Sequence, residues 1–452
     1  MSIDQRRRAV LGAAVGATLA TAPAAAQSAS SRTPPHPGSG VVGLRPNADE
    51  DQTATLQRAL TGAAREQASI RLPPGRFRVS GLILPSGTRL LGAGIGATVL
   101  VHSGAEPLLA ARGGEHITLH GMTLEADAAA SRATPLVSLA DVTGLDVSSI
   151  AVSRASGTAV RLERCGGRIE RCAISDADIG LFSLDAMGLQ VVGNVVDRCR
   201  NNGIQIWRSQ KGYDGTQVLA NRVARIAAEA GGSGQNGNGI NIFRAGGVIV
   251  AQNVVRDCAF SAVRNNAGDD VQILDNSCTD LGEVAIYAEF TFEGCIITGN
   301  LVDRANVGVS ITNFNEGGRL AVVSGNIVRN LSRRFNPAKG AHDGGSGIAV
   351  EADASVTGNV IEGAEVAGIA IGYGAYQRDV MCSGNVVRRC AYGVSVSVAP
   401  GSGPAQIATN ILSECSLGRV VGFDHDKAVT GDLAERMDDR FGHLAVHGNT
   451  GR

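Results

Sequence analysis

Several features that a chain of 452 residues often contains are scarce or missing here. Aromatic residues make up only 4% of the sequence, and Lys and Arg form no cluster outside the extreme N-terminus. Because a phosphate-binding surface needs a positive stripe and the formal net charge is −1, the sequence argues against a nucleic-acid partner. After the N-terminal segment no apolar run is long enough to span a bilayer, so we expect no membrane span in the mature chain.

The N-terminus carries three consecutive arginines at positions 6–8, followed by a short apolar stretch rich in Ala and Gly. Small residues then occupy the two positions that a signal peptidase reads before Gln27. This pattern resembles a twin-arginine signal, which exports folded cargo, and a Sec signal is the alternative. We therefore expect a signal peptide over residues 1–26, the twin-arginine translocase as a partner during export, and a periplasmic or secreted protein. Its cleavage removes three arginines and one aspartate, which changes the formal charge from −1 to −3.

Glycine is abundant, with 60 residues, and it recurs at fixed places, which is typical of a turn repeated many times. One half of the repeat is an Asn flanked by apolar residues, at intervals of 23 to 33 residues. The marked positions are Asn194, Asn221, Asn253, Asn276, Asn300, Asn326, Asn359, Asn385 and Asn410, with Cys172 and Ser149 in the same slot earlier. The other half is a small residue followed by alternating apolar residues, as in Gly203-Ile204-Gln205-Ile206.

Such alternation gives short β-strands with one inward and one outward face. A single coil of these strands cannot bury its inner face, whereas coils stacked about 4.8 Å apart can. The sequence therefore predicts an all-β fold, a single-stranded right-handed parallel β-helix (β-solenoid) of about 12 coils with equivalent residues in ladders. A buried Asn in a turn tolerates the left-handed conformation, and its side-chain amide is expected to bond the same amide one coil away.

The remaining segments suggest how the solenoid is organised. Residues 51–64 have apolar side chains at helical spacing and predict an N-terminal capping helix. We expect a linker over 27–48, the N-terminal cap and first coils over 49–116, the repeats over 117–425, and a C-terminal cap or tail over 426–452. The nine cysteines show no metal or redox spacing, and we expect buried free thiols.

The outward residues of the main strand predict two columns that run from coil to coil. One column holds Gln205, Asn241, Arg264, Tyr287, Ser310, Ala349, Ala370 and Ser395. Its neighbour holds Trp207, Phe243, Asn266, Glu289, Thr312, Glu351, Gly372 and Ser397. Aromatic faces beside polar groups suit a sugar surface. Insertions at 208–216, 229–238 and 333–346 are expected to form the walls of a groove over the middle coils.

These columns supply the candidate site residues. For β-elimination, Lys211 or Tyr287 is the candidate base, and Arg208, Arg244 or Arg264 is the cation that neutralises the substrate acid. Glu289 is a further candidate for acid/base work. The candidate substrate-binding residues are Trp207, Arg208, Tyr213, Asp214, Asn241 and Arg244. Hydrolysis is the alternative and would use two carboxylates among Asp214, Glu289 and Glu351. Simpler explanations are a surface ion pair between Arg264 and Glu289 and a core position for Trp207.

The segment from Asp51 to Gly94, followed by Asn-marked coils, resembles the pectate lyase-like superfamily of right-handed parallel β-helices. With its signal, the chain also resembles a twin-arginine-translocated repeat protein family of unestablished function. Many superfamily members cleave or epimerise acidic polysaccharides and others bind or adhere. Asp269-Asp270 is present, but Gly-His-Gly, Arg-x-Lys and Arg-x-Pro-x-x-Arg are absent, and Asp424-His425-Asp426 is expected to be a solvated turn.

The expectation is thus an exported β-helix protein with a polysaccharide as partner. Two functions stay open, a polysaccharide lyase or other carbohydrate-active enzyme, and a non-catalytic glycan-binding or envelope-structural protein. We expect no metal site and no cofactor, with calcium as the open alternative, because no acidic cluster has the spacing of a metal loop.

Overall fold

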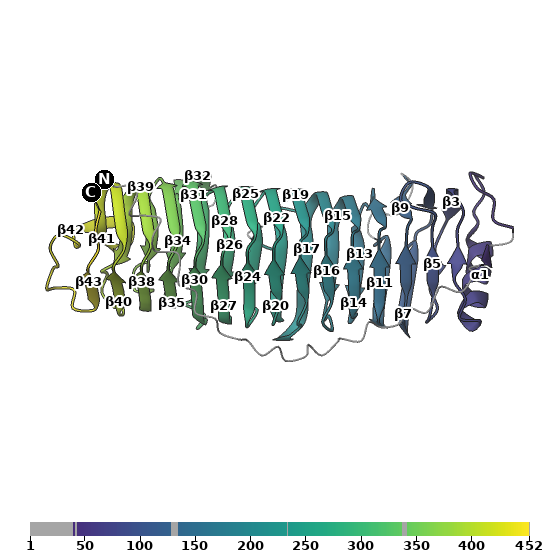
Figure 1. The fold of residues 1–452 in the computed structure, drawn as a ribbon, viewed down its shortest axis with the longest axis horizontal. Helices are drawn as coiled ribbons and strands as arrows, with labels where there is room; N and C mark the ends of the chain where they lie inside the picture. The colour runs from purple at the N-terminus through teal and green to yellow at the C-terminus, as the bar shows by residue number, and fades with distance from the viewer. Residues whose placement is uncertain (1–38, 41–42, 128–133, 233, 337–340, 452) are drawn as a thin grey trace, which may run out of the picture. The chain divides into compact units, whose positions relative to one another are not determined.

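The computed structural model describes residues 39–40, 43–127, 134–232, 234–336 and 341–451. The expected signal peptide and most of the expected linker lie outside these residues. The described chain winds into stacked coils whose strands run parallel, side by side, from β3 near α1 to β41 and β43 (Figure 1). The predicted right-handed parallel β-helix is confirmed.

Each coil contributes strands to three parallel ladders. The first ladder is a 16-stranded sheet. Its strands are β1 (Ser39–Gly40), β2 (Ile70–Arg71), β5 (Arg89–Leu91), β8 (Thr118–His120), β11 (Leu145–Ser148), β14 (Gly167–Glu170), β16 (Gln190–Val192), β18 (Gln217–Leu219), β21 (Ile249–Ala251), β24 (Val271–Leu274), β27 (Glu293–Thr298), β30 (Arg319–Ser324), β35 (Ala352–Thr357), β38 (Arg378–Ser383), β40 (Ala405–Ala408) and β43 (Leu444–His447).

The second and third ladders share a 25-stranded sheet because four long strands run through both. Those four are β15 (Ala173–Leu184), β17 (Val195–Tyr213), β39 (Val386–Ser397) and β41 (Ile411–Asp424). The other strands of the second ladder are β3 (Gly75–Val79), β6 (Thr98–His102), β9 (Thr123–Ala126), β12 (Ala151–Ser153), β19 (Arg222–Ile226), β22 (Val254–Cys258), β25 (Ser277–Leu281), β28 (Leu301–Ala305), β31 (Ile327–Leu331) and β36 (Val360–Ala364).

The third ladder carries the outward columns predicted from the sequence. Its other strands are β4 (Leu82–Ile83), β7 (Leu109–Glu115), β10 (Val137–Thr143), β13 (Thr158–Glu163), β20 (Asn238–Gly246), β23 (Val263–Asn266), β26 (Val284–Glu289), β29 (Val307–Thr312), β34 (Ser346–Val350) and β37 (Ala367–Ile371). Two antiparallel pairs complete the described strands: β32 (Arg333–Asn336) pairs with β33 (Ala341–Gly344), and β42 (Lys427–Asp432) pairs with β41.

The core fills the inside of the coils with aliphatic side chains stacked one above the next. On the third ladder Ile204, Ile240, Val263 and Ile286 succeed one another and are fully buried. Burial of each such side chain contributes roughly 1.5–3 kcal/mol, so every added coil extends the same core. The alternation that the sequence shows therefore sets which residues face outward.

The predicted Asn ladder is confirmed and is one member longer. From Asn221 onward, each side-chain oxygen accepts both the backbone N–H and the side-chain N–H of the Asn one coil earlier, for example at 2.9 and 3.0 Å between Asn276 and Asn300. The series runs without a break from Asn194 to Asn410 and then to Asn449, which lies in the segment expected to be a tail. A Gly-Asn pair at 448–449 repeats the marker of earlier coils.

The ladder Asn itself does not use the left-handed conformation that an Asn tolerates. The left-handed residue is the one before it, such as Gly193 at φ 65° and Ala220 at φ 54°. The corner forms at that residue, which leaves the Asn side chain free to point into the ladder. For the same reason Ile150, not Ser149, occupies the Asn slot of the earliest coil, since Ser149 has φ 52°.

The predicted capping helix is α1 (Thr53–Arg65), and its inward residues Leu56 and Leu60 are buried. Within the described ranges no helix combines the length and apolar character that a membrane crossing requires.

All nine cysteines are free, as expected, and eight of them are buried. Burial raises the pKa of Cys172 to about 11 and that of Cys199 to about 12, so both thiols stay protonated at neutral pH.

Candidate functional site

The outward columns of the third ladder have the predicted register. Gln205 pairs with Asn241, Asn241 with Arg264, and Arg264 with Tyr287, and the column continues to Ser395. In the neighbouring column the residues pair in register from Trp207 to Thr312. The face therefore divides into three parts along the axis, which we describe in turn.

The middle part is a polar cluster that is closed to solvent. Arg264 donates two hydrogen bonds to the carboxylate of Glu289, at 2.7 and 2.8 Å, and the two residues are only 5% and 2% exposed. Glu283 accepts a third bond from Arg264 at 3.3 Å, and the guanidinium lies 4.7 Å from the centre of the Tyr287 ring. The expected ion pair forms, but in the interior rather than on the surface.

The insertion at 229–238 covers this cluster instead of standing beside it as a wall. A Cβ placed on Gly234, whose φ is +120°, would lie 2.2 Å from the guanidinium carbon of Arg264. The Gly234 carbonyl accepts a bond from the Asn241 side chain at 3.3 Å. The expected open groove over the middle coils is therefore wrong, because the loop lies directly on the residues that were to form its floor.

Burial and pairing decide what the proposed catalytic groups can do. Burial raises the pKa of the Tyr287 phenol, which opposes its ionisation to a base. Lys211 forms an ion pair with Asp269 at 2.8 Å and donates to the Thr291 carbonyl at 2.6 Å. These contacts connect the insertion at 208–216 to residues of later coils. Lys211, Tyr287, Arg264 and Glu289 therefore do not meet in one open cavity.

The proposed substrate-binding residues are also spread out. Arg208 donates to the Gln210 carbonyl, and Arg244 donates to the Ser209 carbonyl, both at 3.3 Å. Tyr213 is 80% exposed, whereas Asp214 is buried and burial raises the pKa of its carboxyl. Asn241 lies beneath the 229–238 loop.

Trp207 belongs to an aromatic stack on the N-terminal part of the face. Its ring centre lies 5.5 Å from that of Phe182 and 5.3 Å from that of Phe243. Arg161 covers Phe182 and Arg244 covers Phe243 at 5.2 and 4.7 Å. Trp207 is half-buried, and its indole N–H finds no acceptor within the described part of the chain. The stack packs adjacent coils together and exposes little of each ring face.

The C-terminal part of the face is open and encloses about 750 Å³. We call this hollow the C-terminal groove. Its floor is formed by Ala370 and Gly372 of one coil and Ser395 and Ser397 of the next. These are the positions at which the predicted columns fade to small residues. Because small side chains replace the tyrosine, arginine and glutamate of earlier coils, they leave the space empty.

One wall of the C-terminal groove is formed by the paired strands β32 and β33, which lie within the predicted insertion at 333–346. His342, Asp343 and Arg333 line the groove. The hairpin is fixed at its base, since the Asn306 side chain donates to the Asp343 carbonyl at 2.7 Å. The Arg333 guanidinium donates to the His342 carbonyl at 2.6 Å. These hydrogen bonds fix the position of the hairpin beside the groove floor.

The opposite wall joins a glycine-rich turn to the C-terminal hairpin. Tyr373 donates to Asp426 at 3.1 Å, and its ring meets that of His425 edge to face at 5.2 Å. Ser397 donates to the Gly374 carbonyl at 2.5 Å and so fastens the turn to the floor. The segment Asp424-His425-Asp426, expected to be a solvated turn, contributes two lining residues.

Further along, Tyr392 and Phe423 pack edge to face at 5.0 Å and close the end of the groove. The site thus combines aromatic faces, two imidazoles and carboxylates on two walls over a floor of small residues. Sequence reasoning missed Tyr373, Tyr392 and Phe423. The run Gly372-Tyr373-Gly374-Ala375-Tyr376 was the available signal, because two aromatic residues in a glycine-rich turn have no inward face to occupy.

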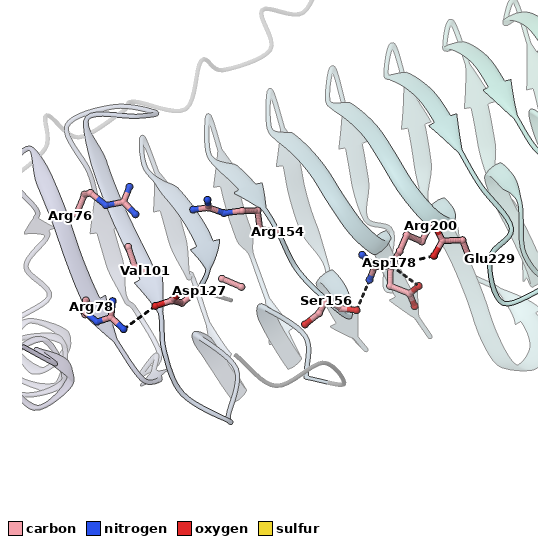
Figure 2. Close-up of a pocket in the computed structure, with 10 residues that line it drawn as sticks. Arg76, Arg78, Val101, Asp127, Arg154, Ser156, Asp178, Arg200 and Glu229 are labelled. Atoms are coloured by element: carbon pink, nitrogen blue, oxygen red, sulfur yellow. Dashed lines mark hydrogen bonds and ion pairs between the residues drawn. The ribbon is translucent and has the colours of Figure 1, made fainter. Parts of the chain in front are cut away.

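A second cavity of about 960 Å³ lies on the second ladder among the first coils and contains four arginines. We call it the arginine cavity; its charged lining residues are Arg76, Arg78, Asp127, Arg154, Asp178, Arg200 and Glu229 (Figure 2). Figure 2 shows Arg76 and Arg154 turned toward one another, and both pair with Glu125. Arg78 pairs with Asp127 at 2.9 Å, and Arg200 lies 3.8 Å from Asp178. Its positive charge is therefore largely compensated.

Comparisons with known proteins agree with this architecture. Residues 41–260 match the model of the family described as rhamnogalacturonase A/epimerase, pectate lyase-like. Residues 215–416 match the model of the periplasmic copper-binding protein NosD. The chain is a parallel β-helix protein. No curated protein matches this β-helix sequence at a significant level.

Several solved structures share the β-helix. Gene product 12 of bacteriophage phi29 is 14% identical with a TM-score of 0.53, and the match covers 85% of this chain and 55% of that protein. The Dettilon tailspike protein is 13% identical with a TM-score of 0.50, over 84% of this chain and 66% of that one. The A-module of mannuronan C-5 epimerase AlgE4 from Azotobacter vinelandii is 18% identical with a TM-score of 0.49, over 64% and 94%. The likeness to the phi29 gene product and to the Dettilon tailspike protein, at TM-scores of 0.53 and 0.50, shows the fold alone.

The copper named in the NosD description finds no matching site in the described residues. No three His, Cys, Asp or Glu side chains within them are grouped so that they could hold a metal ion. Burial raises the thiol pKa of three cysteines in the matched region, Cys278, Cys295 and Cys382, to about 12. The expectation of no cofactor, with calcium as its alternative, stays a prediction.

Proposed function

We propose that this chain is an exported β-helix protein that binds an extracytoplasmic polysaccharide in the C-terminal groove. The observation that carries the proposal is the hollow of about 750 Å³ over a floor of small residues, flanked by Tyr373, Tyr392 and His342. A volume of this size is typical of a ligand site. Tyrosine rings supply flat apolar faces for pyranose rings, and the polar groups beside them suit sugar hydroxyls.

The dimensions of the groove favour a polymer over a single sugar. Its lining residues come from four successive coils, from Ser346 on β34 to Phe423 on β41. Three steps of about 4.8 Å give a length of about 14 Å, which accommodates roughly three sugar units. The family model named for a rhamnogalacturonase and epimerase supports polysaccharide as the ligand class, although its match at 41–260 ends before the groove.

A blocking substitution tests the proposal. Ser395→Trp places an indole on the groove floor, and the same outward column already holds Phe182 and Tyr287, so the fold accommodates an aromatic residue there. Its matched control is Ser138→Trp, in the same column on β10. With the purified full chain and a panel of polysaccharides, we expect Ser395→Trp to weaken binding at least about tenfold and Ser138→Trp to change it less than about twofold. Equal affinity for both variants would contradict the proposal.

The second candidate function is catalysis on the bound polysaccharide. It is favoured by one observation, the contacts among Tyr373, Asp426, His425 and Asp424, which place a phenol and an oriented imidazole beside carboxylates. Such groups can take up and return protons. The lyase mechanism built on Lys211 and Tyr287 has less support, because those groups are paired or buried. Incubation with acidic polysaccharides, followed by unsaturated-uronate absorbance and by reducing ends, tests both reactions. Bound but unchanged polymers would favour binding alone.

Export is part of the same proposal, since the signal lies outside the described residues. Replacing Arg6 and Arg7 by Lys is expected to trap the chain in the cytoplasm of a host with a twin-arginine translocase. Unchanged export of that variant would favour the Sec pathway.

A further inference from the structure

The charge of the C-terminal groove points to the class of polysaccharide that it holds. Among its lining residues Asp343, Glu365 and Asp426 carry negative charge, and Arg333 carries the positive charge. With neutral histidines the formal sum is therefore −2. Carboxylates stand on both walls, because Glu365 lies on the hairpin side, where it accepts a bond from the Arg333 backbone N–H at 2.8 Å, and Asp426 lies opposite, beside Tyr373.

Two arginines near this groove, Arg333 and Arg419, already donate hydrogen bonds to groups of the protein itself. The Arg333 guanidinium donates to the His342 carbonyl on its own hairpin. Arg419, the next arginine toward the C-terminus, pairs with Asp432 and Glu435. A sugar carboxylate entering the groove would therefore meet more negative than positive charge.

We propose that the C-terminal groove selects a polysaccharide without acidic groups and binds an amine-bearing one more tightly still. The proposal rests on the proposed function and names its ligand class. It runs against the expectation of an acidic substrate that the superfamily suggests. The proposal also distinguishes the C-terminal groove from the arginine cavity, which contains four arginines and lies on the second ladder.

The size of the effect follows from Coulomb's law. A net charge of two units about 7 Å from one sugar carboxylate, in a water-like dielectric, lowers affinity roughly fivefold to tenfold. A protonated sugar amine at the same distance raises the affinity by a similar factor. Because the groove is open, salt screens both effects, and 0.5 M salt should remove most of the difference.

The experiment uses matched polymers that differ in charge but not in linkage. The pairs are β-1,4-glucan with β-1,4-glucuronan, β-1,4-mannan with mannuronan, and α-1,4-galactan with galacturonan oligomers; chitosan oligomers supply the amine. Affinities for the purified full chain are measured at low and high salt. We expect the neutral member of the pair that binds to exceed its acidic partner by at least about fivefold.

Charge-neutral variants give the sharper test. Glu365→Gln with Asp426→Asn keeps the acceptor atoms for Arg333 and Tyr373 while removing two charges. We expect the acidic polymer to gain roughly fivefold to tenfold, the amine polymer to lose as much, and the neutral polymer to change by less than about threefold. A variant with merely weakened folding would lower all three affinities together.

Each outcome decides between the two proposals. Preference for acidic polymers that Ser395→Trp abolishes would overturn the ligand class and leave the groove as the binding site. Binding that survives Ser395→Trp but is lost in Arg76→Ala with Arg154→Ala would place the glycan in the arginine cavity and overturn both. No binding of any polymer would overturn the proposed function itself.

Discussion

Removing one rung of the Asn ladder gives a prediction whose size can be worked out from the structure. Asn300→Ala takes away the oxygen that accepts the backbone N–H and the side-chain N–H of Asn276, at 2.9 and 3.0 Å. It also removes the donor to the Ile273 carbonyl at 2.9 Å, the Thr298 carbonyl at 3.2 Å and the Asn326 side-chain oxygen at 3.0 Å. Five polar groups thereby lose a hydrogen bond, and a buried group left without any other partner costs about 1–3 kcal/mol. We expect the free energy of unfolding to fall by about 3–6 kcal/mol, a large part of the stability of a typical protein.

Two controls separate the ladder from a general effect of losing an amide. Asn194→Ala, at the first rung, removes the acceptor of a single donor, the Cys172 backbone N–H, instead of two. It should therefore cost about 1 kcal/mol less than Asn300→Ala. Asn315→Ala, at an exposed turn, should stay within about 0.5 kcal/mol of the parent chain.

The assay is denaturant unfolding of the full chain, followed by circular dichroism, for the parent and the three variants. If Asn300→Ala proves as stable as Asn315→Ala, the ladder contributes little to stability and the reasoning is refuted. If Asn194→Ala costs more than Asn300→Ala, the count of orphaned donors does not govern the effect.

Three further predictions concern the interior. Arg264→Met leaves the Glu289 carboxylate buried without its cationic partner and should lower the free energy of unfolding by about 3–5 kcal/mol in denaturant unfolding. The control Arg319→Met removes an exposed ion pair with Glu293 and should lower it by less than about 1 kcal/mol. Similar losses for the two variants would refute the contribution assigned to the buried ion pair. Burial raises the pKa of Glu351 above its ordinary value of 4.5, so its contribution to stability is present below that pH and is lost as pH rises through the folded-state pKa. Relative to Glu351→Gln, the parent chain should therefore gain stability between pH 7 and pH 4.5, and the opposite trend would contradict this sign. A thiol reagent should count nine thiols in denaturant, with the half-buried Cys415 reacting first in the native protein, and fewer than nine would reveal a disulfide.

The sequence predicts the strands and their register well because both are local consequences of alternation. Once Ile204 and Ile206 face inward, Gln205 must face outward, and the coil length places it beside Asn241. The Asn ladder follows in the same way, since one buried amide per coil can satisfy its neighbours only if all lie in a single file.

The site was harder to predict because it depends on where the insertions fold. Nothing in residues 229–238 indicates that Gly234 would lie on the Arg264 guanidinium, although only a residue without a Cβ fits there. In the sequence, the change of the columns from polar and aromatic residues to small ones such as Ala370 and Ser395 suggests that the later coils carry no site. In three dimensions it creates the space, because Tyr373 and the β32–β33 hairpin rise on either side of it. The outward residues of the strands therefore predict the floor of the groove, whereas its walls depend on how the insertions fold.

A crystal structure of the chain with a bound non-acidic oligosaccharide tests the central claim most directly. The account predicts sugar rings over Ala370 and Ser395, between His342 of the hairpin and Tyr373 of the opposite wall. Sugar density in the arginine cavity, or on the stack of Phe182, Trp207 and Phe243, with the C-terminal groove empty, would contradict it.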